Sequence, residues 1–214
     1  MRKKTLHPVL SFIVVFLLCA GCLPATAYAM ATRVDILLVN RSNPLPRDFD
    51  PGELVNLYEQ KRHFRLASSE IYLEKDTFEA ANRMFRQAEK DGVNRFTITS
   101  GYRAWDAQKE LYDKDTEGTA AAPGESEHQT GLAFDVTTRR DRGGFEDTEQ
   151  YQWLIENCWD YGFILRYPEG KEEITGFAYE SWHYRYVGVE AAKVIHQNDW
   201  TLEEYCEGNP QSTP

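Results

Sequence analysis

Hydrophobic residues recur with helical spacing over residues 76–91, the clearest secondary-structure pattern in the chain. The apolar stripe consists of Phe78, Ala81, Phe85 and Ala88. This three- and four-residue spacing places the side chains on one face of a helix. Asp76 and Glu79 begin the segment in the manner of a capping box, and Gly92 follows its end. The pattern predicts an amphipathic helix that covers a core.

The rest of the chain mixes short strands with helices, without the regular strand–helix repeat of a parallel α/β sheet. Period-two alternation and aromatic or β-branched residues predict strands at 71–73, 96–99, 163–166 and 182–187. Helical spacing predicts helices at 54–58, 104–113, 147–161 and 189–196, before a last short helix capped by Thr201 and Glu204. The 214 residues suit one domain, so we expect a single α+β domain.

Residues 126–136 place a histidine and a carboxylate seven positions apart. If a turn leads into a strand here, alternation puts Asp135 on one face beside only Gly131 and Ala133. The opposite, core-like face carries Leu132, Phe134 and Val136. An acid that points into space cleared by small residues suits a metal ligand with room for water and substrate. The alternative is a turn with a surface Asp135 and an incidental His128.

A second stretch, residues 179–187, supplies another histidine in a strand-like run, with Glu180 three positions before His183. His128, Asp135 and His183 make three N/O ligands, the number found in a catalytic zinc site whose fourth position is open to water. Glu180 is then the spare carboxylate that such a site needs as a general base. Since residues i and i+3 of a strand face opposite ways, we expect Glu180 in the turn before the strand.

The same run carries three aromatic residues and an arginine around His183. Trp182, Tyr184 and Tyr186 share the face opposite the histidine, and we expect them in the core. Arg185 shares the face of His183, where it is either a plain surface charge or part of the site.

The two stretches together resemble the VanY-type zinc D-alanyl-D-alanine carboxypeptidases. The shared motifs are Ser-x-His-x-x-Gly-x-Ala-x-Asp at 126–135 and Glu-x-Trp-His at 180–183. Further family-like segments are 38–40, 100–103 with Gln108, 162–168 and 186–188, so the likeness covers nearly all of the chain from Val34 to Cys206. The family belongs to a superfamily with lysostaphin-type peptidases and the hedgehog signalling domain. This implies a small, mainly antiparallel sheet with helices on one side and at the ends.

The resemblance also implies an activity and a site. One zinc ion would be held by His128, Asp135 and His183, and Glu180 would serve as base. The enzyme would trim the terminal D-Ala from peptidoglycan stem peptides. Arg103 would either pair the carboxylate of the substrate or stabilise the oxyanion.

Three further residues are substrate-binding candidates by the same resemblance: Ser126, Gln108 and Tyr102. The family often has Ser or Thr where this chain has Ala104. An L,D-carboxypeptidase that acts on tetrapeptide stems is the alternative within enzymes, because the family carries both activities on the same motifs. A metal-bound but inactive binding module, as in hedgehog domains, is the alternative from another class. The intact Glu180 argues against it.

The N-terminus predicts export. Three basic residues at 2–4 precede an apolar run at 9–19, and Ala27-Tyr28-Ala29 is a cleavage signal, so residues 1–29 are expected to be a signal peptide. Cys22 ends a partial lipobox, which leaves a lipid anchor as the alternative. We expect one zinc carboxypeptidase domain at 30–208, beginning with an extended arm at 30–50, and a flexible tail at 209–214. Either route places the protein outside the cytoplasmic membrane.

The charge of the mature chain limits the kinds of partner it can bind, and its cysteines bear on a disulfide. The signal peptide removes three basic residues and no acidic ones, which leaves 21 basic and 34 acidic side chains and a net charge of −13. Such a chain does not bind nucleic acid by charge, and we expect a monomer with a peptide substrate. Cys158 and Cys206 are the two cysteines that remain. Export favours a disulfide between them, and the alternative is two buried free thiols.

Overall fold

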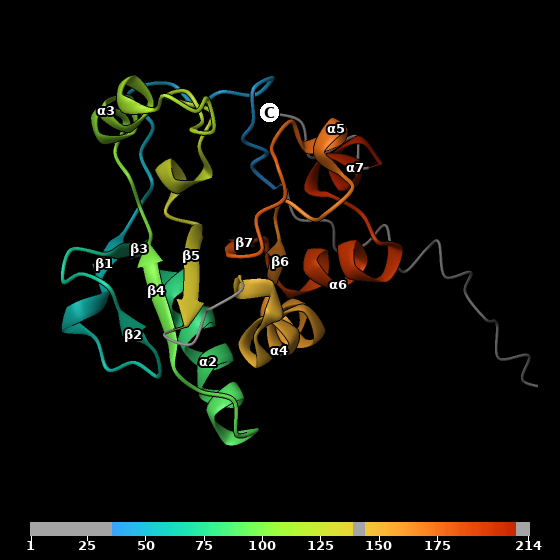
Figure 1. Cartoon of the computed structure of the whole chain (residues 1–214). Helices are drawn as coiled ribbons and strands as arrows, with labels where there is room; N and C mark the ends of the chain where they lie inside the picture. Colours follow the sequence, from blue (N-terminus) through green and yellow to red (C-terminus); the bar gives the residue numbers. More distant parts are fainter. Residues whose placement is uncertain (1–35, 139–143, 209–214) are drawn as a thin grey trace, which may run out of the picture. The chain divides into compact units, whose positions relative to one another are not determined.

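A five-stranded sheet organises the structure, a computed structural model that describes residues 36–138 and 144–208 (Figure 1). In spatial order the strands are β2 (Arg65–Leu66), β4 (Phe96–Ser100), β5 (Ala133–Thr138), β7 (His183–Tyr186) and β6 (Phe163–Leu165). Among these described strands, β2 and β4 pair in parallel and the other neighbours are antiparallel. This is the small, mainly antiparallel sheet expected of the α+β domain.

The described residues belong to one compact unit, Arg33–Pro214. The predicted signal peptide, including Cys22, and the predicted tail at 209–214 lie outside the described residues, as do residues 139–143. Within the described ranges no helix combines the length and apolar character that crossing a membrane requires.

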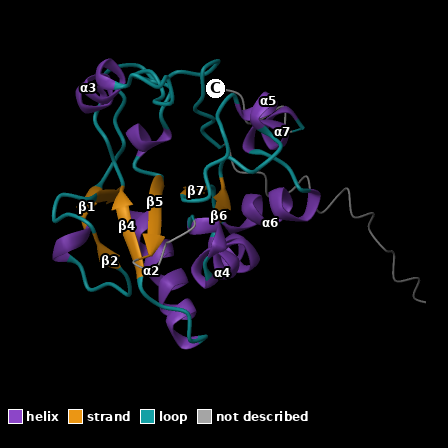
Figure 2. Cartoon of the chain, in the orientation of Figure 1, coloured by secondary structure: helices purple, strands orange, loops and turns teal. Residues whose placement is uncertain are grey.

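Helix α2 (Lys75–Lys90) covers one face of the sheet, and its bounds agree with the predicted amphipathic helix (Figure 2). Phe85 of the helix packs against Phe96 of β4 and Phe134 of β5, with ring centroids 4.8 and 5.9 Å apart. All three side chains are buried. Burial of one such side chain contributes about 1.5–3 kcal/mol, so this contact fixes the helix on the sheet.

The short helix predicted at 54–58 is wrong. Strand β1 (Leu54–Asn56) occupies the first part of this segment and pairs antiparallel with β3 (Tyr72–Glu74). A 3-10 turn, η1 (Leu57–Glu59), follows. Strand pairing satisfies the backbone groups of the segment and overrides its local helical spacing. The same pairing places Glu74 before α2, where its carboxylate, rather than Asp76, caps the helix.

In Figure 1, one of the remaining helices lies above the sheet and the others lie on its β7–β6 side. They are α3 (Trp105–Lys114), α4 (Glu149–Asn157), α5 (Glu172–Thr175), α6 (Val189–Asn198) and α7 (Leu202–Glu207), with 3-10 turns η2 (Glu127–Thr130), η3 (Phe145–Asp147) and η4 (Cys158–Tyr161). The helix predicted at 147–161 is therefore divided into three pieces. The predicted capping box of the last helix is present, formed by Thr201 and Glu204.

The predicted disulfide is wrong, because the structure does not join Cys158 to Cys206. Cys158 belongs to the main hydrophobic cluster, with Leu154 and Phe163. Cys206 belongs to a second cluster around α6 and α7, with Leu202. Burial raises the pKa of the Cys158 thiol to about 12. Each cysteine acts as a small apolar side chain within its own cluster.

Backbone carbonyls of the N-terminal segment contact buried arginines of the sheet. Leu37 O accepts a hydrogen bond from Arg185 Nη2 at 2.7 Å, and Val39 O accepts one from Arg166 Nη2 at 3.5 Å. Farther along, Leu45 N donates to Gly124 O at 2.8 Å. These contacts tie the segment to the strands that carry the site.

Candidate metal centre

His128 lies in the 3-10 turn η2, which follows α3 and its loop and leads into β5. Its ring is buried, and Nδ1 donates to the backbone oxygen of Gly101 at 2.8 Å, since a carbonyl can only accept. Nε2 therefore carries the free lone pair and points at Asp135 Oδ2, 3.4 Å away. A histidine held in this way is the usual arrangement of a metal ligand.

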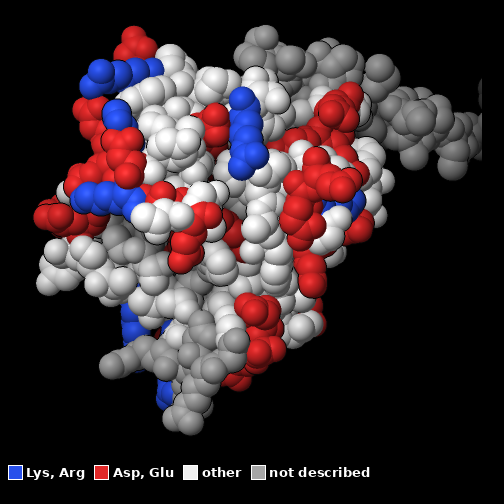
Figure 3. All heavy atoms as spheres, turned by 45° about the horizontal axis from the view of Figure 1, so that its top comes forward, with Lys and Arg blue, Asp and Glu red and all other residues white. Residues whose placement is uncertain are grey.

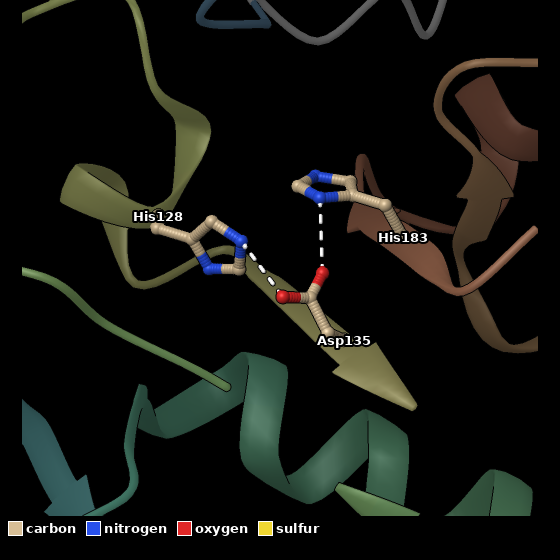
Figure 4. A group of neighbouring side chains, drawn as sticks. All are labelled: His128, Asp135 and His183. Carbon is tan, nitrogen blue, oxygen red and sulfur yellow. Dashed lines mark ion pairs between the residues drawn. The ribbon is translucent and has the colours of Figure 1, made fainter. Parts of the chain in front are cut away.

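Asp135 projects from β5 between the two histidines (Figure 4), directly opposite His183 in the strand register. Its Oδ1 lies 3.2 Å from His183 Nδ1 and has no hydrogen-bond partner among the described residues. Burial alone would raise the pKa of this carboxyl, but His128 and His183 outweigh it and hold the pKa well below its usual range. The site thus contains a half-buried, ionised carboxylate with one buried, unused oxygen, which suits a cation.

His183 begins β7 and is likewise buried. Its Nδ1 faces Asp135, while Nε2 points to the opposite side, 3.6 Å from Glu127 Oε2. Burial opposes the charged ring, but the contacts with Asp135 and Glu127 prevail and raise the pKa of His183 to about 9. The surroundings of this ring therefore favour a positive charge.

The structure brings the three predicted ligands together. One ligand atom from each of His128, Asp135 and His183 lies within 4.8 Å of the others. Two ring nitrogens and one carboxylate oxygen form a donor set typical of zinc, and the unused Asp135 oxygen fits a bound cation. The site can therefore hold a metal ion with these three residues as ligands.

Glu180 lies in the turn before β7, as the spacing to His183 predicts. Its Oε2 is 3.5 Å from His183 Nδ1, and its side chain is 26% exposed, which leaves it open to the pocket. Burial raises the pKa of this carboxyl above its ordinary value. Asp135 and Glu180 thus have opposite environments, one stabilising the charged form and one disfavouring it.

A pocket of about 170 Å³ opens in front of the metal centre. It is lined by Arg103, Gln108, Leu111, Thr119, Ala120, Ala121, Ser126, His128, Asp135, Tyr167, Phe177, Glu180, Trp182 and His183. Of the predicted substrate-binding residues, Arg103, Gln108 and Ser126 line it. Tyr102 is not among the lining residues, and its backbone N–H donates to Tyr72 O at 2.7 Å.

Arg103 is held in place from two sides, so it is not a surface ion pair. Its Nη1 donates to Gln108 Oε1 at 2.8 Å, and its Nη2 donates to Ser100 Oγ at 3.0 Å. Gln108 in turn donates to Ala121 O at 2.7 Å, and its side chain is buried. Gln108 therefore orients the arginine and links it to the loop that borders the pocket.

Of the residues around His183, Trp182 differs from the prediction, and Arg185 settles an open alternative. Trp182 is 43% exposed and lines the pocket instead of joining the core, because it lies in the turn that precedes the strand. Tyr184 is buried in the main cluster as expected, and Tyr186 packs against that cluster. Arg185 is fully buried, which rules out a plain surface charge.

A buried charged cluster, not predicted from the sequence, lies behind the metal centre. It consists of Glu127, Arg166, Arg185 and Glu203. The available signal was the position of two arginines inside strand-like apolar runs, where burial requires an acidic partner. Burial alone would raise the pKa of Glu127, but Arg166 and Arg185 outweigh it and hold that pKa well below its usual range.

Comparison with known proteins identifies relatives along most of the chain. Residues 70–189 match the family model of VanY, described as D-alanyl-D-alanine carboxypeptidase. A putative carboxypeptidase, YodJ, of Bacillus subtilis is 41% identical over 186 residues, which cover 80% of this chain and 67% of that protein. A D-alanyl-D-alanine carboxypeptidase of Enterococcus faecium is 38% identical over 176 residues, 81% of this chain and 57% of that protein. The chain thus spans 57–67% of the length of these two relatives.

Solved structures agree with this assignment. The LD-carboxypeptidase LdcB has a TM-score of 0.71 at 41% identity, over 79% of this chain and 84% of that one. The D,D-pentapeptidase VanY from a VanB-type resistance cassette, in complex with Zn(II), has a TM-score of 0.67 at 37% identity, over 80% of this chain and 98% of that one. The chain therefore belongs to the VanY family of D-alanyl-D-alanine carboxypeptidases.

Proposed function

We propose that this chain is an exported, zinc-dependent D-alanyl-D-alanine carboxypeptidase that removes the terminal D-Ala from peptidoglycan stem peptides. The observation that carries the proposal is the arrangement of His128, Asp135 and His183 in one pocket with a separate carboxylate, Glu180, and a fixed arginine, Arg103. The zinc complex of the related VanY supports the choice of metal.

A zinc ion bound by His128, Asp135 and His183 would polarise the scissile carbonyl and lower the pKa of a water molecule at the site. Glu180, with its pKa raised by burial, is suited to accept the proton of the attacking water. The same carboxyl group can then return that proton to the leaving amine of D-Ala. Metal binding and proton transfer are thus assigned to two different carboxylates.

Arg103 recognises the C-terminal carboxylate of the substrate in this proposal. Both Nη atoms donate one hydrogen bond within the protein, to Gln108 and to Ser100. Each terminal nitrogen of a guanidinium carries two N–H groups, so each retains one for a ligand. Two such donors match the two oxygens of a carboxylate. This pairing explains why the enzyme would cleave only at a free C-terminus.

Product analysis tests the proposal. Purified protein loaded with one equivalent of zinc is incubated with pentapeptide and tetrapeptide stems, and the products are identified by mass spectrometry. We expect loss of one D-Ala from the pentapeptide, abolished by a chelator and restored by zinc. Cleavage of the tetrapeptide alone would establish the L,D-carboxypeptidase instead, a candidate supported by the likeness to LdcB. No cleavage of either stem by zinc-loaded protein would favour the inactive binding module.

Export rests on the predicted signal peptide at 1–29. Mass spectrometry of the protein from the culture medium and from washed cells tests it. We expect a chain that begins at Met30. A lipid-modified chain that begins at Cys22 would replace secretion by membrane anchoring, and an intact Met1 inside the cell would contradict export.

A further inference from the structure

Glu127 uses only one of its carboxylate oxygens in the buried charged cluster. Oε1 accepts hydrogen bonds from Arg166 Nε and Arg185 Nη1, both at 2.7 Å. Arg166 also donates hydrogen bonds from Nη2 and Nη1 to the Glu203 carboxylate, at 2.6 and 2.8 Å. Arg185 donates a further hydrogen bond from Nη2 to Leu37 O at 2.7 Å. Because both arginines hold the same oxygen, the orientation of the carboxylate is fixed.

The other oxygen, Glu127 Oε2, is directed at the metal centre. It is buried and has no hydrogen-bond partner among the described residues, and the same holds for His183 Nε2. The two atoms are 3.6 Å apart, longer than a hydrogen bond but within ion-pair distance. A buried carboxylate oxygen without a partner is costly, and a ring N–H directed at it is the partner available.

We infer that Glu127 is a positioning residue that keeps the proton of His183 on Nε2 and thereby leaves Nδ1 free to bind the metal. Nδ1 is the nitrogen that faces Asp135. The inference rests on the proposed metal-dependent function and adds a carboxylate–histidine–metal arrangement to it. His128 has the mirror arrangement, since the carbonyl of Gly101 holds its proton on Nδ1 and leaves Nε2 for the metal. The two ligands are thus oriented by different protein groups.

The geometry makes Glu127→Gln a specific test. In this variant the amide oxygen must take the place of Oε1, because both arginines can only donate. The amide NH₂ group then faces His183 Nε2 and donates to it. This moves the ring proton to Nδ1, the nitrogen needed by the metal. We expect the zinc affinity to fall by roughly 10–100-fold, the usual effect of losing a group that orients a metal ligand.

Glu203→Gln provides the matched control. Glu203 accepts from the same Arg166, so this variant also removes one negative charge from the cluster. Glu203 has no hydrogen bond or ion pair with His183 in the described structure, so the tautomer of the ring is unaffected. Zinc affinity is measured for both variants and the unmodified protein by competition with a chromophoric chelator, without substrate. We expect Glu203→Gln to remain within about threefold of the unmodified protein, against the 10–100-fold loss for Glu127→Gln.

Equal zinc affinities for the two variants would overturn the inference, because the effect would then come only from the charge of the cluster. If Glu127→Gln does not fold, nitrogen NMR of the zinc-loaded, unmodified protein decides the question. A protonated Nε2 of His183 supports the inference, and zinc bound at Nε2 overturns it. The outcome is separable from the proposed function, because a protein that binds zinc through an oriented His183 but cleaves no stem peptide would refute only the activity.

Discussion

Glu180 and Asp135 both contact the ring of His183, yet their environments differ. Two histidines hold the pKa of Asp135 well below its usual range, whereas burial raises the pKa of Glu180. Carboxylates whose pKa values are pushed apart take different chemical roles. A carboxylate that is ionised at neutral pH, as in Asp135, suits a metal ligand, and Glu180 suits a group that gains and loses a proton.

Paired substitutions separate these two roles. Glu180→Gln keeps the shape of the side chain and removes the proton acceptor, so zinc content should persist while turnover falls by roughly 10²–10⁴-fold. Asp135→Asn removes a charged ligand, so zinc content and turnover should fall together. Metal analysis and D-Ala release are measured on both variants in parallel. Loss of zinc from Glu180→Gln with retention in Asp135→Asn would reverse the assignment of the carboxylates.

At the scale of elements, the site depends on the junction between η2 and β5. Gly131 makes this junction with a φ of 71°, a left-handed conformation that side chains disfavour. A Cβ at this position would lie 2.9 Å from Leu54 Cδ2 and 3.0 Å from the backbone nitrogen of Glu74. Gly131 thus allows β3 to approach the segment that joins His128 to Asp135.

Gly131→Ala should therefore destabilise the protein by more than the conformational term of about 1–2 kcal/mol. The control is Gly170→Ala, since Gly170 has a similar φ of 79° but no atom within 4 Å of the position that a methyl group would take. The difference between the free energies of unfolding of the two variants, measured with denaturant, gives the cost of the steric contacts made by the added methyl group at position 131. We expect Gly131→Ala to be the less stable of the two and to bind zinc more weakly. Equal stabilities would show that β3 does not constrain the junction.

At the scale of the whole molecule, the features of the fold and site that the sequence predicts are those set by local periodicity and motif spacing. Periodicity locates the α2 helix and the strands around His183, and the spacing of two motifs brings together three ligands from η2, β5 and β7. The strand at 54–56 forms because it pairs with β3, and Trp182 is exposed because of the turn before β7. Neither feature can be predicted from the sequence of its own segment alone. The Glu127 cluster joins residues 37–58 positions apart, so only the folded sheet reveals it.

The charged residues of the molecule fall into two sets, an acidic surface that the composition predicts and a buried, paired cluster that it does not. Acidic side chains outnumber basic ones on the face shown in Figure 3, in line with the net charge of −10 for the full sequence. Arg166 and Arg185 are nevertheless buried with Glu127 and Glu203, where their charges are neutralised inside the domain. The acidic composition therefore describes the surface, while the metal centre depends on a separate, paired set of charges.

The raised pKa of His183 links the protonation of this ring to the stability of the whole domain. In the metal-free protein this pKa is about 9, against 6.5 for an ordinary histidine. The folded state then holds the proton more tightly than the unfolded state, so the stabilisation is complete below pH 6.5 and is lost as the pH rises through 9. A metal ion must displace this proton, so zinc affinity should increase over the same interval.

Thermal unfolding with chelator and with excess zinc, from pH 6.5 to 9, measures both effects. We expect the melting temperature of the metal-free protein to fall with rising pH and the increment produced by zinc to grow, because stabilisation by a ligand follows its affinity. His196→Gln is the control, since His196 stacks on Trp159 and not on the metal centre, and it should leave both trends unchanged. His183→Gln should abolish them. A metal-free melting temperature that stays constant or rises across this interval would mean that the Asp135 and Glu127 carboxylates do not hold a proton on His183.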